Sequence, residues 1–175
     1  MSLFSKIFGN KQKDRQFHDD AAEGRHEKVL EHIKRGIDVN SRNPSGGTAL
    51  MIAAKRGHLR VIQSLLQSGA DPNIALNGPD QTYRALHSAA QEGYDQIVGA
   101  LLDQGAAINA ATGHGETALI SAAFYGRTST VQLLLSRGAD PDRTAMGKRA
   151  SDWARENGHT TTAQVLEAAQ GCKKL

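Results

Sequence analysis

The chain has 175 residues, of which 39% are hydrophobic and 5% aromatic, and its formal net charge is +3. This length allows one globular unit or one short repeat array, and the scarcity of aromatic residues disfavours a single large aromatic core. The sequence contains neither a run near the roughly 20 apolar residues of a membrane span nor a signal-peptide pattern, and its single cysteine excludes an internal disulfide, so we expect a cytoplasmic protein.

Residues 1–16 are a basic segment that by itself carries a charge of +3. Its apolar residues fall at helical spacing and are Leu3, Phe4, Ile7 and Phe8. Three interpretations stay open: weak contact with an anionic membrane surface, docking on the structure that follows, or disorder. Because the rest of the chain is electrically balanced, it lacks the basic stripe of a nucleic-acid-binding surface, and we predict no nucleic-acid partner.

The remainder of the chain repeats with a period of about 33 residues, marked by two series of glycines. The first series is Gly24, Gly57, Gly93, Gly126 and Gly158, and the second, 12 residues later, is Gly36, Gly69, Gly105 and Gly138. Apolar residues at helical spacing between the two series predict a helix, which the second glycine ends by adopting a left-handed backbone conformation. A shorter helix precedes each first-series glycine, as in 48–54 and 117–123. Turn-forming residues such as 69–73 and 138–142 predict hairpin-like loops between repeats.

This pattern resembles the ankyrin repeat. The resemblance rests on the segments 47–50, 57–59, 65–66 and 69–71, and on 85–90, which matches the motif TPLHxAA with alanine in place of proline. It implies an all-α solenoid of helix-turn-helix units, with five repeats at about 17–42, 43–75, 76–111, 112–144 and 145–170 and a tail at 171–175. Polar residues in the first and last copies, such as Lys28 and Thr160, indicate capping repeats, so we expect a complete array.

No residue pattern indicates catalysis, a cofactor or a metal site. The sequence has no GxSxG motif, and the loop Gly113-His114-Gly115 lacks the lysine of a phosphate-binding loop. Cys172 lies in a polar tail whose two lysines argue against prenylation. His18, His26 and His32 have no acidic or cysteine companion at ligand spacing. The resemblance implies that His58, His87 and His159 bond to neighbouring backbone instead.

The resemblance also implies where a protein partner binds, on a concave face formed by the ends of the first helices and the hairpin tips. The corresponding residues are Lys55, Arg56, Gln91, Glu92, Phe124 and Tyr125 on the helices, and Ser45, Tyr83, His114, Glu116, Met146 and Lys148 on the tips. Phe124 and Tyr125 are the strongest candidates, unless one ring packs on a neighbouring repeat. Lys55 and Arg56 suit acidic partner groups but are equally explained as solvated charges.

The hairpin of the third repeat, 75–83, is three residues longer than its neighbours. Tyr83 is either a second anchor at its tip or part of a longer loop that the fold tolerates without any function. The leading interpretation is a monomeric, non-catalytic scaffold for a protein partner. The alternative is a peripheral membrane adaptor anchored by residues 1–16.

Overall fold

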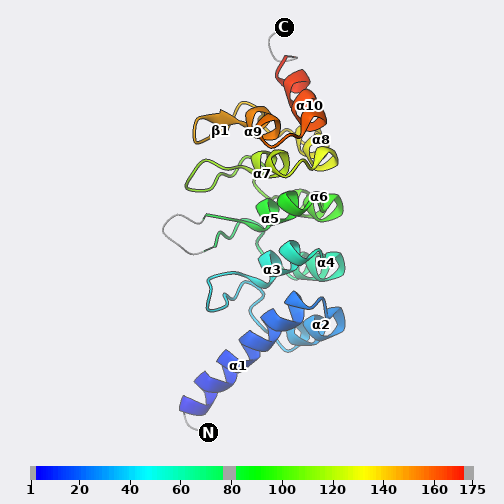
Figure 1. Cartoon of the computed structure of the whole chain (residues 1–175). Helices are drawn as coiled ribbons and strands as arrows, with labels where there is room; N and C mark the ends of the chain where they lie inside the picture. Colours follow the sequence, from blue (N-terminus) through cyan, green and yellow to red (C-terminus); the bar gives the residue numbers. More distant parts are fainter. Residues whose placement is uncertain (1–2, 77–81, 172–175) are drawn as a thin grey trace.

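The computed structural model describes residues 3–76 and 82–171, which form a stack of helix pairs (Figure 1). The pairs are α1 (Leu3–Ala22) with α2 (His26–Lys34), α3 (Ala49–Arg56) with α4 (Leu59–Gln67), α5 (Ala85–Glu92) with α6 (Asp95–Asp103), α7 (Ala118–Phe124) with α8 (Thr128–Ser136), and α9 (Ala150–Glu156) with α10 (Thr160–Gly171). Cys172 and the rest of the tail, and the middle of the lengthened hairpin, lie outside the described residues.

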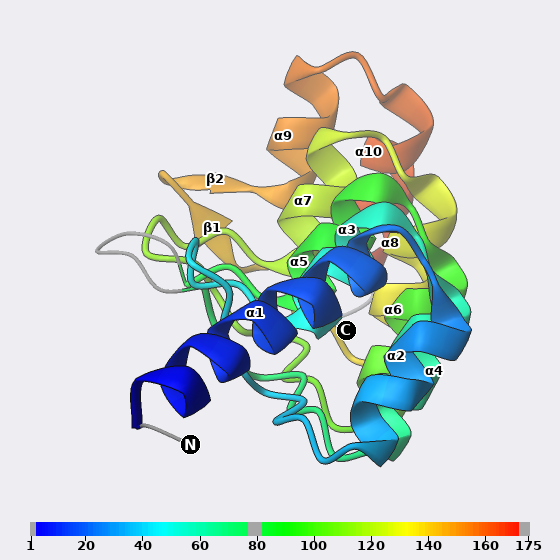
Figure 2. The ribbon, with the colours of Figure 1, turned by 90° about the horizontal axis from the view of Figure 1, so that it is seen from below.

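The stack has two helical layers and a row of hairpins. The odd-numbered helices contact one another in sequence to form an inner layer, and the even-numbered helices form an outer layer. Seen from below, the hairpins lie on the side of the inner helices away from the outer ones (Figure 2). The hairpin of the fifth repeat forms two short antiparallel strands, β1 (Thr144–Ala145) and β2 (Lys148–Arg149). Single bridges close the hairpins of the second and fourth repeats. The predicted all-α solenoid with hairpin-like loops is thus confirmed.

The helix ends follow from local chemistry. The hydroxyls of Thr48 and Thr117 accept hydrogen bonds from the N–H groups of the third residues of α3 and α7. In α5 and α9 the third residue accepts a hydrogen bond from the backbone N–H of the residue that precedes the helix, through His87 Nδ1 or Asp152 Oδ2. All nine marker glycines have positive φ, between 66° and 89°. The left-handed conformation predicted for the second series is thus confirmed.

Adjacent repeats are joined through the residue that follows each first-series glycine. His58 Nε2 lies 2.9 Å from the carbonyl oxygen of Ala22, and His159 Nε2 lies 3.1 Å from that of Phe124. Arg127 occupies the same position and donates from Nε to the carbonyl oxygen of Gln91 at 2.9 Å. These side chains lie directly over the marker glycine of the preceding repeat, so the predicted structural role of His58 and His159 is confirmed.

Helix α1 continues through the predicted boundary at residues 16 and 17, and its C-terminal part is the inner helix of the first repeat. Phe17 is fully buried there, and the carboxylate of Asp20 is buried beside it. Asp20 lies 3.0 Å from both Arg25 Nη1 and His32 Nε2. Burial tends to raise the pKa of Asp20, but its hydrogen bonds with Arg25, His32 and Gln16 together lower it.

Spacing in the sequence did not reveal the acidic neighbour of His32, because Asp20 lies 12 residues away on another helix. Arg25 already neutralises that carboxylate, which makes the cluster an ion-pair network that holds α1 against α2. Within the described residues no group of three histidine, cysteine or acidic side chains is placed to hold a metal ion, and no helix is both long and apolar enough to cross a membrane.

Candidate functional site

The inner helices of the second to fifth repeats and the hairpins of the third to fifth repeats line an open groove with a volume of about 820 Å³. A smaller pocket of about 250 Å³ continues the groove toward α3 and the hairpin of the second repeat. The two hollows adjoin, since both are lined by Lys55, Leu76, Tyr83 and Gln91. We refer to the larger hollow as the groove and to the smaller one as the α3 pocket. Together they form one depression along the stack.

The C-terminal end of the groove is apolar, and we call it the aromatic end. It is lined by Phe124, Tyr125, Met146 and Trp153. The Phe124 ring lies 5.0 Å from the Tyr125 ring and 5.7 Å from the Trp153 ring, measured between centroids. Phe124 therefore packs on the next repeat, as one of the two alternatives expected, and its side chain is still 37% exposed. Its role as a partner contact remains a prediction.

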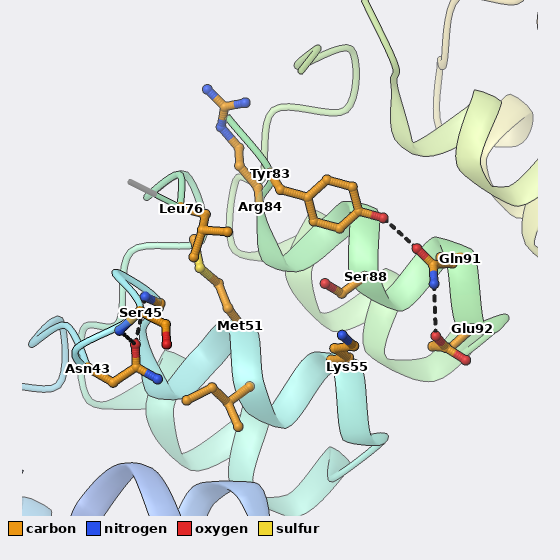
Figure 3. Close-up of a pocket in the computed structure, with 12 residues that line it drawn as sticks. Asn43, Ser45, Met51, Lys55, Leu76, Tyr83, Arg84, Ser88, Gln91 and Glu92 are labelled. Carbon is orange, nitrogen blue, oxygen red and sulfur yellow. Dashed lines mark hydrogen bonds between the residues drawn. The ribbon is translucent and has the colours of Figure 1, made fainter. Parts of the chain in front are cut away.

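Tyr83 lies in the middle of the groove wall. Its ring packs 5.0 Å from that of buried His87, and its hydroxyl donates to Gln91 Oε1 at 2.7 Å (Figure 3). Gln91 Nε2 in turn donates to Glu92 Oε1 at 3.1 Å. Burial raises the pKa of the Tyr83 hydroxyl. The expected position of Tyr83 at the hairpin tip is wrong, because these contacts hold the side chain against α5.

The polar groups of the groove differ in how far they are already bonded. Ser121 Oγ donates to Glu116 Oε1 at 2.6 Å, which fixes that carboxylate. Lys55, in contrast, is exposed and makes no hydrogen bond or ion pair within the described part of the chain. Lys55 is therefore available for a partner's acidic group.

The structure brings most of the predicted binding residues together. Those that line the groove are Lys55, Tyr83, Gln91, His114, Glu116, Phe124 and Tyr125. Glu92 lines the α3 pocket, whereas Arg56 is exposed at the end of α3 and lines neither hollow. Their role in binding remains a prediction.

Sequence reasoning missed Trp153, Ile52 and Ser88, which also line these hollows. All three are the fourth residue of an inner helix, and the equivalent residue of α7 is Ser121. Comparing this position across the repeats shows that it changes freely between apolar and polar residues, which is the signal that identifies it as part of the concave surface.

Comparison with known families decides what kind of stack this is. A model described as "Ankyrin repeats (3 copies)" matches residues 17–112, and one described as "Ankyrin repeat" matches 114–145. The chain belongs to the ankyrin-repeat family. The pair α9 and α10 lies beyond the matched residues, and the structure shows it as a fifth helix pair in the stack, so its assignment as a fifth ankyrin repeat remains a prediction. Ankyrin repeats generally mediate protein–protein interaction and are generally non-catalytic.

The chain is similar to a part of each of several larger proteins. It is 37% identical over 122 residues to "Ankyrin repeat and KH domain-containing protein mask-1" of Caenorhabditis elegans, a match to 69% of this chain and 4% of that protein. It is 36% identical over 134 residues to "Mitochondrial disaggregase" of Bos taurus, covering 74% of this chain and 19% of the relative. It is 33% identical over 129 residues to "E3 ubiquitin-protein ligase XBAT33" of Arabidopsis thaliana, covering 74% of this chain and 25% of that protein. The chain thus matches a quarter or less of the length of each of these relatives.

Proposed function

We propose that this chain is a non-catalytic ankyrin scaffold that binds a segment of a protein partner in the groove. The observation that carries the proposal is the position of its exposed apolar side chains. Within the described residues, the large hydrophobic side chains classed as exposed are Phe124, Tyr125 and Met146, and all three line the same groove. Exposed apolar residues gathered in one hollow mark an interaction site, whereas scattered ones need no explanation.

The surrounding structure supports binding with little loss of entropy. The groove walls are inner helices packed against one another, and the Tyr83–Gln91–Glu92 chain of hydrogen bonds holds one wall in place (Figure 3). A rigid surface loses few side-chain conformations on docking, so a small number of buried aromatic contacts is enough to set the affinity.

Replacing Phe124 and Tyr125 together by alanine is expected to weaken binding at least about tenfold, because aromatic side chains at the centre of an interface carry most of its energy. The ligands for this test are peptides selected on the chain from a displayed random library, labelled and titrated by fluorescence anisotropy. The matched control replaces Gln63 and Gln132, exposed on outer helices α4 and α8, by alanine. Circular dichroism checks that both double variants remain folded. Unchanged affinity in the Phe124/Tyr125 variant would reject the groove as the binding site.

A further inference from the structure

Met146 has an unusual backbone conformation. Met146 and Gly147 are the two residues between β1 and β2, and their φ angles are 52° and 77°. A two-residue hairpin with positive φ at both positions favours Asn-Gly, because asparagine tolerates the left-handed region that other side chains avoid. Within the described residues Met146 is the non-glycine residue with positive φ.

The side chain of Met146 is also unfavourably placed for the free protein. It is 77% exposed, yet it lines the aromatic end together with Phe124 and Tyr125. Fold stability therefore explains neither the backbone conformation nor the exposed thioether. Strained backbone positions are concentrated at binding sites. A flexible, polarisable methionine is well suited to close over an apolar group of a ligand.

The opposite end of the groove carries an unpaired basic side chain. Lys55 stands where the groove meets the α3 pocket and makes no hydrogen bond or ion pair within the described residues. The nearby carboxylates of Glu92 and Glu116 accept hydrogen bonds from Gln91 and Ser121 and do not pair with Lys55. An acidic side chain of a ligand is therefore the complementary group at Lys55.

We infer that the groove binds an extended partner segment that places an acidic side chain at Lys55 and a large apolar side chain between Met146 and the Phe124–Tyr125 pair. This inference rests on the proposed function and specifies the chemistry of its ligand. Packed helices lie about 8–10 Å apart, so the three steps from α3 to α9 span about 24–30 Å. An extended chain covers that distance with about seven to nine residues.

Selection from a displayed library of random dodecapeptides tests the composition of the ligand. The enriched peptides are expected to contain Asp or Glu and, about seven to nine positions away, Leu, Met or Phe. Changing the acidic residue of a selected peptide to lysine is expected to weaken binding at least about tenfold, since it opposes like charges. Peptides that bind and depend on Phe124 and Tyr125, but lack the acidic or the apolar residue, would overturn this inference while leaving the proposed function intact.

Met146→Asn is expected to change stability and binding in opposite directions. It relieves the strained turn, which raises Tm by about 2–4 °C for a chain of this size, and it removes the apolar contact, which weakens peptide binding about tenfold. Met146→Leu is the matched control, because it keeps an apolar side chain in the same turn and should retain the affinity within about threefold. Wild-type affinity in Met146→Asn would overturn the inference.

Charge reversal tests the other end of the groove. Lys55→Glu is expected to weaken binding of the acidic peptides about tenfold or more and to restore binding of their lysine versions. Arg60→Glu, on the exposed side of α4, changes the net charge equally and should leave both affinities unaltered. Equal effects of the two reversals would show a long-range field and no contact at Lys55. Self-association in analytical ultracentrifugation that Met146→Asn abolishes would instead assign the aromatic end to a second copy of this chain, which also overturns the inference.

Discussion

Replacing Gly126 by alanine is expected to lower the free energy of unfolding by about 2–5 kcal/mol, as the sum of backbone strain and overpacking. Gly126 has a φ of 66°, which any L side chain resists. A Cβ atom there would also lie 2.5 Å from Nδ1 and 2.6 Å from Cγ of His159. His159 would have to move, and its hydrogen bond to the carbonyl oxygen of Phe124 would be lost with it.

Gly138→Ala is the matched control, because Gly138 has a φ of 89° but no atom within 4 Å of the position of a Cβ. Its free energy of unfolding should fall by about 1–2 kcal/mol, because backbone strain is the only cost of the added Cβ. Urea denaturation followed by tryptophan fluorescence suits the comparison, since Trp153 is the single tryptophan and lies in α9, beyond the altered junction. Equal losses in the two variants would mean that the contact between the repeats does not contribute to stability.

The contrast between these glycines shows how far the sequence predicts the fold. Both glycine series, the helix limits and the hairpins were predictable, because they depend on residues close together in the chain. The contacts between adjacent repeats were harder to predict from the sequence. The residue after the marker glycine is a histidine, a tyrosine or an arginine in different repeats, so its shared position over the preceding glycine appears only when the repeats are stacked.

The groove was predictable where position within a repeat determines exposure. Phe124 and Tyr125 follow from that rule, since framework packing does not require aromatic residues at the end of an inner helix. The contacts of Tyr83 and the position of Trp153 do not follow from it. Tyr83 was expected at a hairpin tip, whereas its hydroxyl bonds to Gln91 on α5. Trp153 resembles a core residue until α7 is placed beside it. The hydrogen bond between Asp20 and His32 was missed for the same reason, because it joins two helices.

His87 gives the fold a predictable dependence on pH. Its ring is buried between α5 and the hairpin of the fourth repeat, where Nε2 lies 3.1 Å and 3.2 Å from the carbonyl oxygens of Ala110 and Glu116. Because carbonyl oxygens only accept hydrogen bonds, Nε2 carries the proton, and Nδ1 accepts from the backbone N–H of Arg84 at 3.2 Å. Burial lowers the pKa of His87 from about 6.5 to about 4. The neutral ring satisfies all its neighbours, and a second proton would have to displace the Arg84 hydrogen bond.

The stability that depends on neutral His87 is fully present above pH 6.5, and it is expected to be lost as the pH falls from about 6.5 toward 4. In that range the unfolded chain binds a proton that the folded chain does not. The loss at pH 4.5, relative to pH 7.5, should be about 2–3 kcal/mol by linkage from these two pKa values.

His87→Gln keeps an amide donor for the carbonyls but cannot titrate. It should be less stable at pH 7.5 by about 1–3 kcal/mol, because the Arg84 N–H loses its acceptor. Urea denaturation of both proteins at the two pH values isolates the contribution of His87, since every other ionisable group is present in both proteins. The difference between the proteins should therefore shrink or reverse at pH 4.5, and a constant difference would show that His87 titrates alike in the folded and unfolded chains.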